Sequence, residues 1–199
     1  MKTPAIAVLG IQGGIEEHLA MLKTVPGIEA FATIKAYELE AADGIILPGG
    51  ESTAIGKLIE DFGLAHSITQ KAHAGAPIWG TCAGAILLAK TIENDFRCHL
   101  ALMDITIKRN AYGTQMNSFI DYQVLPFLGS EVFPLVFIRA PIITRVYGNA
   151  IILGKHGNDI IAVQQENLIA TTFHPELAEN NRFHAWFANK VLEHSRQAS

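Results

Sequence analysis

Apolar positions in the first half of the chain alternate between short continuous runs and helical spacing. The continuous runs cover residues 5–9, 44–47 and 77–79. Runs this short, without alternating polar positions, are typical of strands that are buried on both faces of a parallel sheet. The segments that follow them have helical spacing over residues 15–25, 52–62 and 85–90, and Ser52 is the expected N-cap of the second one. This alternation predicts βαβ units and a parallel sheet.

The second half is richer in predicted strands. They cover residues 105–108, 120–125, 135–138, 150–153, 160–164 and 169–173, with turns at Gly157-Asn158 and Glu166-Asn167. A C-terminal helix is predicted because Phe183, Trp186, Phe187 and Val191 recur at helical spacing, and we expect them in the core. The chain of 199 residues is short for two domains. We therefore predict one α/β domain over residues 1–199, with three layers and a flavodoxin-like mixed sheet between helices.

Composition excludes several classes of protein. Hydrophobic residues make up 49% of the chain and charged residues 17%, which excludes disorder as the main state. A net charge of −4 without a basic block argues against nucleic-acid binding. The apolar runs are much shorter than the roughly 18 residues that a membrane span needs. Two cysteines, Cys82 and Cys98, cannot form a disulfide framework, so we expect a protein of the reducing cytoplasm.

The strongest candidate for chemistry is Cys82 in the pentapeptide Gly80-Thr81-Cys82-Ala83-Gly84. This is the pattern glycine-x-nucleophile-x-glycine between a predicted strand and a predicted helix, which is the context that a nucleophile elbow needs. The two glycines allow a sharp turn and close approach of neighbouring backbone. The alternative is a small cysteine that is simply buried where a strand meets a helix. Cys98 has no such context, and we expect a passive thiol.

A cysteine nucleophile needs a base and a group that orients the base. His174 follows a predicted strand directly and precedes Pro175-Glu176, at the strand end where α/β sheets gather their sites. Glu176 could then orient the imidazole, although a strand-end histidine beside a surface glutamate remains the alternative. His156 lies in a predicted turn. The remaining histidines, which we expect to be solvated, are His18, His66, His73, His99, His184 and His194. No spacing typical of a metal site is present.

A second turn closes the strand at residues 44–47 and reads Pro48-Gly49-Gly50-Glu51-Ser52. Paired glycines let consecutive amides face one direction, which makes an anion-binding nest or half of an oxyanion hole. A plain connection between strand and helix is the alternative. The spacing of a phosphate-binding P-loop is absent.

Taken together, these motifs resemble those of a known family. The sequence contains LGIQG at 9–13, LPGGEST at 47–53, WGTCAG at 79–84, KRNAYG at 108–113, FIRAP at 137–141 and FHPEL at 173–177. With Cys82 and His174-Pro175-Glu176, they resemble the class I, triad-type glutamine amidotransferases, and among these the glutaminase subunits of pyridoxal 5′-phosphate synthases. The resemblance runs from the first predicted strand to the last helix.

The resemblance implies a reaction and a role for each matching residue. Cys82 would be the nucleophile, His174 the base and then the acid, and Glu176 the group that orients it. L-Glutamine would be hydrolysed to glutamate and ammonia through a thioester, without a metal or cofactor in this chain. The ammonia would pass to a synthase subunit in a hetero-oligomeric complex. Glutamine would be held by Gly50, Glu51, Ser52, Arg109, Ile138 and Arg139, and the oxyanion by the backbone N–H groups of Gly50 and Ala83.

Two features of the sequence depart from the family. Its members usually carry arginine where Thr114 stands, at a loop or a partner contact. Ile55-Gly56-Lys57 also differs, and we expect it to touch the partner surface. Without the family, Arg109 and Arg139 would be taken as ordinary surface arginines. Two other functions stay open. One is a class I glutaminase for a different pathway, and the other is a cysteine sensor or binding module, which loss of His174 or Glu176 would have favoured.

Overall fold

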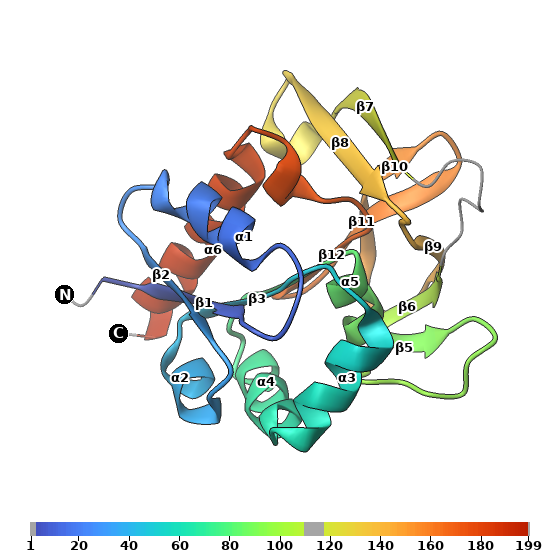
Figure 1. Cartoon of the computed structure of the whole chain (residues 1–199). Helices are drawn as coiled ribbons and strands as arrows, with labels where there is room; N and C mark the ends of the chain where they lie inside the picture. Colours follow the sequence, from blue (N-terminus) through green and yellow to red (C-terminus); the bar gives the residue numbers. More distant parts are fainter. Residues whose placement is uncertain (1–2, 110–117, 199) are drawn as a thin grey trace.

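A parallel sheet forms the centre of the molecule. The computed structural model describes residues 3–109 and 118–198 (Figure 1). Five neighbouring strands are parallel and lie in the order β2-β1-β3-β4-β12. Their bounds are β1 Ala5–Leu9, β2 Glu29–Thr33, β3 Gly44–Leu47, β4 Ile78–Thr81 and β12 Leu168–Thr171.

Beyond β12 the sheet becomes mixed. It continues through β11, β9, β6 and β5, and β10 pairs with β11 at its other edge. Only the β5–β6 pair is parallel here. The bounds are β5 Ala89–Ile92, β6 Met103–Lys108, β9 Ile142–Val146, β10 Ile151–His156 and β11 Asp159–Gln165. A separate antiparallel ribbon joins β7 Ser118–Val124 to β8 Val132–Ile138.

Helices cover both faces of the sheet, as Figure 1 shows. On one face lie α1 Ile15–Lys23 and α6 Arg182–Ala198. The other face carries α2 Ala36–Ala41, α3 Ser52–Asp61, α4 Leu64–His73 and α5 Ala83–Leu88. Two short 3₁₀ turns, Pro126–Leu128 and Pro175–Leu177, complete the described structure. This arrangement of three layers around a mixed sheet is the predicted α/β fold class.

The central strands have continuous apolar sequences because both of their faces are buried. Ile6 and Val8 point into the core under α1 and α6. Ala7 and Leu9 point into the core on the opposite side. The predicted bounds of β1 and β3 are confirmed to the residue, and the aromatic side of α6 is confirmed as core at Phe183 and Phe187.

Some local predictions were wrong. The N-cap of α3 is Glu51 rather than Ser52, because the Glu51 carboxylate accepts hydrogen bonds from the N–H groups of Thr53 and Ala54, at 3.0 and 2.7 Å. The predicted helix at residues 85–90 ends at Leu88, and Lys90 already belongs to β5. The strand predicted at 169–173 ends at Thr171. The elements β2, β5, β9, α2 and α4 were not predicted. The edge strand β2 is partly exposed and lacks a continuous apolar run.

Candidate active site

The turn between β4 and α5 holds Cys82 in a strained conformation. Its φ is 49° and its ψ is −103°, and its N–H donates to the Thr171 carbonyl at 2.8 Å. A Cβ on Gly80 would lie 2.4 Å from the backbone of Gly84, and a Cβ on Gly84 would lie 2.0 Å from the Leu47 carbonyl oxygen. Both flanking positions therefore require glycine. Strain of this kind at a non-glycine residue is typical of functional sites, where the surrounding structure maintains it.

His174 and Glu176 reach this turn from the adjacent strand. β12 pairs with β4 in parallel, with Thr171 opposite Thr81, so the residues after both strands meet at one edge of the sheet. Nδ1 of His174 lies 2.7 Å from Oε1 of Glu176. The backbone of Gly49 lies so close to them that a side chain would not fit there. A Cβ on Gly49 would lie 2.6 Å from His174 Cε1 and 3.4 Å from Cys82 Cβ. The predicted cysteine, histidine and glutamate thus come together.

Burial and charge act in opposite directions on this group. Burial by itself would lower the pKa of His174, but hydrogen bonds to Cys82 and Glu176 outweigh it and raise the pKa to about 10. For Glu176, burial would raise the pKa, and the hydrogen bond and positive charge of His174 act against it, so that the net shift is downward. The arrangement therefore favours a protonated imidazole beside a carboxylate.

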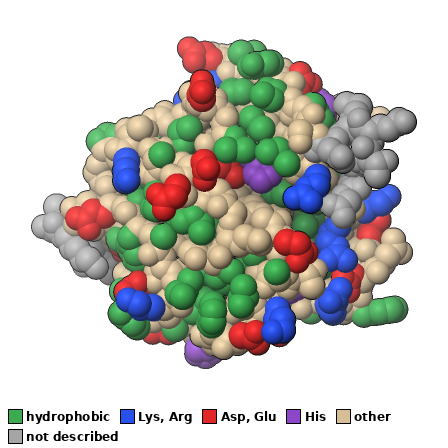
Figure 2. All heavy atoms as spheres, in the orientation of Figure 1, with side chains coloured by type: hydrophobic (Ala, Val, Ile, Leu, Met, Phe, Trp, Pro, Cys, Tyr) green, Lys and Arg blue, Asp and Glu red, His purple; other side chains and the backbone are tan. Residues whose placement is uncertain are grey.

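These side chains open into a cavity of about 440 Å³. Cavities of this size are typical of sites for small molecules. In the orientation of Figure 2, Lys and Arg side chains gather on the right-hand side of the molecular face. The lining includes every residue predicted for the site: Gly50, Glu51, Ser52, Cys82, Ala83, Arg109, Ile138, Arg139, His174 and Glu176.

The turn after β3 supplies backbone groups to the cavity. Gly50 has a φ of +146°, which residues with side chains rarely adopt. A Cβ on Gly13 would lie 1.6 Å from the Gly49 carbonyl oxygen, so this carbonyl faces Gly13. In a trans peptide the N–H points opposite to the carbonyl, which leaves the Gly50 N–H on the side away from Gly13. The next N–H, that of Glu51, donates to Gln12 Oε1 at 3.1 Å.

Arg109 is held by two neighbours at the rim of the cavity. Its Nη1 donates to Thr53 Oγ1 at 3.0 Å, and its Nη2 lies 3.0 Å from Asp95 Oδ2. Burial would raise the pKa of Glu51, but the N–H groups of Thr53 and Ala54, with the charge of Arg109, lower it overall. The rim therefore presents an anionic and a cationic group.

Ile138 and Arg139 reach the cavity from the end of β8. Arg139 itself has a φ of 44°, which is uncommon for a residue with a side chain. The ribbon of β7 and β8 thus contributes to the site although it lies outside the main sheet.

Two expectations about a partner surface meet different outcomes. Thr114 lies outside the described residues. At the second place, Ile55 and Gly56 are buried, and a Cβ on Gly56 would lie 2.0 Å from His99 Nδ1. Only Lys57 is exposed, 2.9 Å from Asp61 Oδ2. The expectation that this tripeptide faces a partner therefore fails for its first two residues.

The prediction that six histidines are solvated was wrong for two of them. His18 and His184 are completely buried and contact each other, Nδ1 to Nε2, at 2.9 Å. His66 and His73 are exposed, whereas His99 and His194 are half-buried. The error arose because the local sequence around His18 is polar, and its burial depends on α6 packing against α1. One signal in the sequence could have predicted this burial: His18 lies on the same helical face as Leu19 and Leu22, which faces the sheet.

Within residues 3–109 and 118–198, no three His, Cys, Asp or Glu side chains are grouped in a way that could hold a metal ion. None of the helices described is both long and apolar enough to cross a membrane.

Comparison with known proteins identifies first the class of the fold and then the family of the chain. A solved structure described as "Crystal structure of glutamine amidotransferase" superimposes with a TM-score of 0.87 at 38% identity, covering 94% of this chain and 98% of that one. The fold is thus that of the glutamine amidotransferases. A sequence match over residues 8–193 then shows that the chain belongs to the SNO glutamine amidotransferase family.

Curated relatives narrow the similarity further. A protein of Ruminiclostridium cellulolyticum named pyridoxal 5′-phosphate synthase subunit PdxT is 49% identical over 186 residues, covering 94% of this chain and 98% of the relative. A protein of the same name from Thermoanaerobacter pseudethanolicus is 48% identical over 182 residues, covering 92% and 96%. The similarity therefore spans nearly the whole of each protein.

Proposed function

We propose that this chain is the glutaminase subunit of a pyridoxal 5′-phosphate synthase, acting in the cytoplasm as one domain over residues 1–199. The observation that carries the proposal is the meeting of Cys82, His174 and Glu176 in one cavity that also contains the six residues expected to hold glutamine. Relatives of similar length that bear the name of this synthase subunit give the proposal its partner.

Acyl transfer to Cys82 is the first half of the reaction. The thiolate attacks the side-chain amide carbon of glutamine, and the carbonyl oxygen becomes an oxyanion held by the N–H groups of Gly50 and Ala83. Ala83 is the first residue of α5, so its N–H has no acceptor within the helix. The protonated His174 gives its proton to the leaving nitrogen. Ammonia departs as the C–N bond breaks, and a thioester remains.

Hydrolysis of the thioester is the second half. Neutral His174 now takes a proton from a water molecule, and the resulting hydroxide attacks the thioester carbon. A second oxyanion forms in the same place and collapses. Glutamate leaves, the C–S bond breaks, and Cys82 and His174 return to the thiolate and imidazolium forms. Glu176 accepts the Nδ1 proton of His174 as a hydrogen bond throughout and holds the ring in place.

Substrate recognition follows from the charges at the rim. Free glutamine carries an ammonium and a carboxylate group, and Glu51 and Arg109 offer the opposite charges on the same cavity. Arg139 and Ile138 close the side of the cavity next to β8. Ammonia then passes to the synthase subunit, which builds the pyridoxal phosphate ring, so this chain needs no cofactor of its own.

The experiment assays the complex of this chain with its synthase subunit. With glutamine as nitrogen source, the wild-type complex should release glutamate and form pyridoxal 5′-phosphate, and Cys82→Ala should do neither. Supplying an ammonium salt should restore pyridoxal 5′-phosphate formation in the Cys82→Ala complex, because ammonia then bypasses the glutaminase. Cys98→Ala, which removes the exposed cysteine, is the matched control and should behave as wild type. Full activity of Cys82→Ala with glutamine would refute the proposal.

A further inference from the structure

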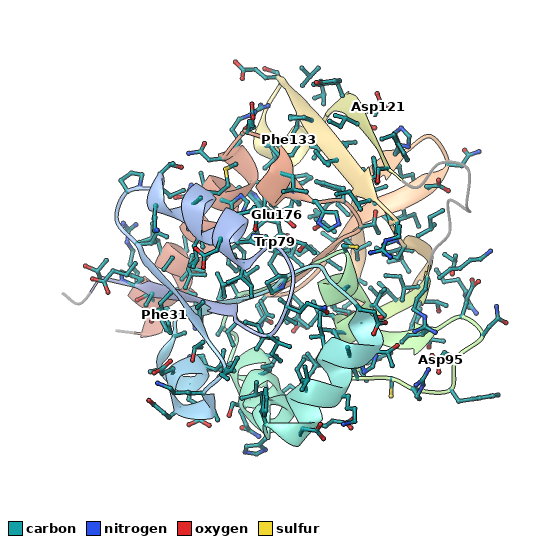
Figure 3. All side chains as sticks on the ribbon, viewed as in Figure 1. Phe31, Trp79, Asp95, Asp121, Phe133 and Glu176 are labelled. Atoms are coloured by element: carbon teal, nitrogen blue, oxygen red, sulfur yellow. The ribbon has the colours of Figure 1, made fainter. Side chains whose placement is uncertain are left out.

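Behind Glu176, away from the cavity, lies a buried polar cluster that the reaction described above does not use. His18 Nε2 is 3.5 Å from Oε2 of Glu176 and 3.3 Å from Oγ1 of Thr81, and His18 Nδ1 is 2.9 Å from Nε2 of His184. All four residues are buried. Figure 3 labels both Glu176 and Trp79 near the centre of the molecule. The centroid of the Trp79 ring lies 5.5 Å from that of His18 and 5.1 Å from that of His184.

The protonation pattern of this cluster follows from its two ends. At one end, Nδ1 of His184 is buried without a hydrogen-bond partner among the described residues. A buried N–H without an acceptor is costly, so this nitrogen carries no proton and the proton of neutral His184 is on Nε2. That N–H donates to Nδ1 of His18, and the proton of His18 is consequently on Nε2.

The Glu176 end of the cluster independently indicates the same tautomer of His18. Oε2 of Glu176 is buried and has no hydrogen bond within the usual distance from the described residues. A carboxylate oxygen in that position needs a donor and is repelled by a lone pair. His18 Nε2 faces it at 3.5 Å, so a proton on Nε2 attracts this oxygen where a lone pair would repel it. Both ends therefore place the His18 proton on Nε2.

We propose that the Nε2–H of His18, which is shared between Thr81 Oγ1 at 3.3 Å and Glu176 Oε2 at 3.5 Å, holds the Glu176 carboxylate in place. His18 is then a positioning residue of the glutaminase reaction, and His184 sets its tautomer. Glu176 is then held through both oxygens, by His174 on Oε1 and by His18 on Oε2. A carboxylate fixed at two points cannot rotate away from the imidazole during the two proton transfers. Burial lowers the pKa of both His18 and His184, which agrees with neutral rings. This inference rests on the proposed function.

The test uses two substitutions of His18, glutamine and asparagine, whose side-chain amides replace different ring nitrogens. The amide of His18→Gln reaches the place of Nε2 and keeps a donor toward Glu176, whereas His18→Asn reaches only the place of Nδ1. In the complex with the synthase subunit, kcat for glutamine hydrolysis should fall about 10- to 100-fold in His18→Asn and stay within about threefold of wild type in His18→Gln. KM should change little, since His18 does not line the cavity.

A double-mutant cycle separates positioning from a general effect on packing. If His18 acts through Glu176, His18→Asn should cause no further loss of kcat in a Glu176→Gln background. An equal loss in both backgrounds, or a wild-type kcat in His18→Asn, would overturn the inference. His184→Leu replaces a ring that has an unpaired nitrogen, so it should fold even where His18→Asn does not. It should lower kcat, again only when Glu176 is present, and a wild-type kcat would overturn the role of His184.

The rate of alkylation of Cys82 by iodoacetamide gives a readout that does not depend on glutamine. It is measured in the Cys98→Ala background, so that Cys82 is the reacting thiol. His18→Asn should slow it and His18→Gln should leave it close to the parent. Absence of glutamine hydrolysis in the parent complex would refute the proposed function, while unchanged alkylation in His18→Asn would refute the positioning role. The two failures are therefore distinguishable.

Discussion

The cavity has a buried wall and an exposed wall, and the two are held by different physical means. On the buried wall, Cys82, His174 and Glu176 are 7%, 9% and 3% exposed. A strained turn, two glycines in contact with backbone and a histidine pair behind Glu176 fix their positions. On the other wall, called the exposed wall, Gly50 and Glu51 are exposed and Arg109 is half-buried.

This difference indicates that the buried wall serves proton transfer and the exposed wall serves substrate binding. In the buried wall the effective dielectric constant is low, so each hydrogen bond and charge has a large effect on proton transfer. In the exposed wall, water screens the ion pairs, so that each one contributes modestly to binding. Gly50 is also confined by the ends of two side chains, Ile55 and Gln12, rather than by backbone. We therefore expect a rearrangement in the exposed wall rather than in the buried wall.

The largest effect is expected at His174 in the buried wall. His174→Asn should lower kcat by about 10²–10⁴-fold, because one imidazole serves both proton transfers. Glu176→Gln should cost less, since the nucleophile and the oxyanion donors remain. Glutamate release by the complex with the synthase subunit measures both. A wild-type rate in His174→Asn would show that His174 does not carry the proton transfers, and the buried wall would then have no special role in catalysis.

Control by the partner tests whether the exposed wall rearranges. We expect the isolated chain to be slow and the synthase subunit to raise its rate by about 10²–10³-fold, the effect of one oxyanion donor. Glycine at position 50 lets the peptide turn its N–H toward or away from the substrate, and docking would favour one orientation. Gly50→Ala should therefore blunt the increase.

A glycine elsewhere provides the control for this experiment. Gly63 also has a positive φ, of +68°, and has open space around it, so Gly63→Ala introduces backbone strain away from the cavity. Its stimulation by the synthase subunit should match that of wild type. Equal rates of the wild-type chain with and without the synthase would contradict a switch at Gly50.

Arg109 on the exposed wall should affect binding more than chemistry. Arg109→Leu should raise KM for glutamine by up to about fivefold with little change in kcat, because a charge pair screened by water contributes about 0.2–1 kcal/mol to binding. Arg145→Leu, at an exposed arginine of β9 that does not line the cavity, is the control. A fall in kcat at unchanged KM would place Arg109 with the buried wall instead.

The smallest effect is on stability as the pH falls from 6.5 to 5. Burial lowers the pKa of His18 and His184 in the folded chain, against the charges of Glu176 and Glu17 that raise it for His18. The unfolded chain therefore binds more protons in this range, and the free energy of unfolding should decrease toward pH 5. His174, with a pKa of about 10, stays protonated in the folded state, whereas the unfolded imidazole gains its proton as the pH falls through about 6.5. It therefore opposes the slope near pH 6.5 and no longer contributes toward pH 5.

Denaturant unfolding at several pH values measures this slope. His184→Leu removes one of the two buried imidazoles and should flatten it. The variant His73→Leu, at an exposed histidine of α4, should leave it unchanged. An unaltered slope in His184→Leu would mean that His184 is charged in the folded protein, which would contradict a neutral polar cluster behind the buried wall.

Local features of the sequence were sufficient to predict much of the site. The pentapeptide around Cys82 predicted the sharp turn because its glycines and flanking elements are contiguous in the chain. The bounds of β1 and β3 followed from apolar runs, since a strand buried on both faces has no polar side. His174 and Glu176 could be paired because they are two residues apart at the end of one strand. The resemblance to a family supplied the roles of Arg109, Ile138 and Arg139, which their local sequence did not.

Only the tertiary structure decided which side chains contact Glu176 and Arg109. His18 and His184 lie 166 positions apart and meet because α1 and α6 pack on the same face of the sheet. Asp95 and Thr53, which hold Arg109, likewise come from separate parts of the chain. Burial of a histidine and the choice of its partner depend on contacts between distant elements, and the pattern of neighbouring residues does not encode them. Spacing along the chain fixes strands and turns, whereas the packing of layers fixes hydrogen-bond partners and pKa values.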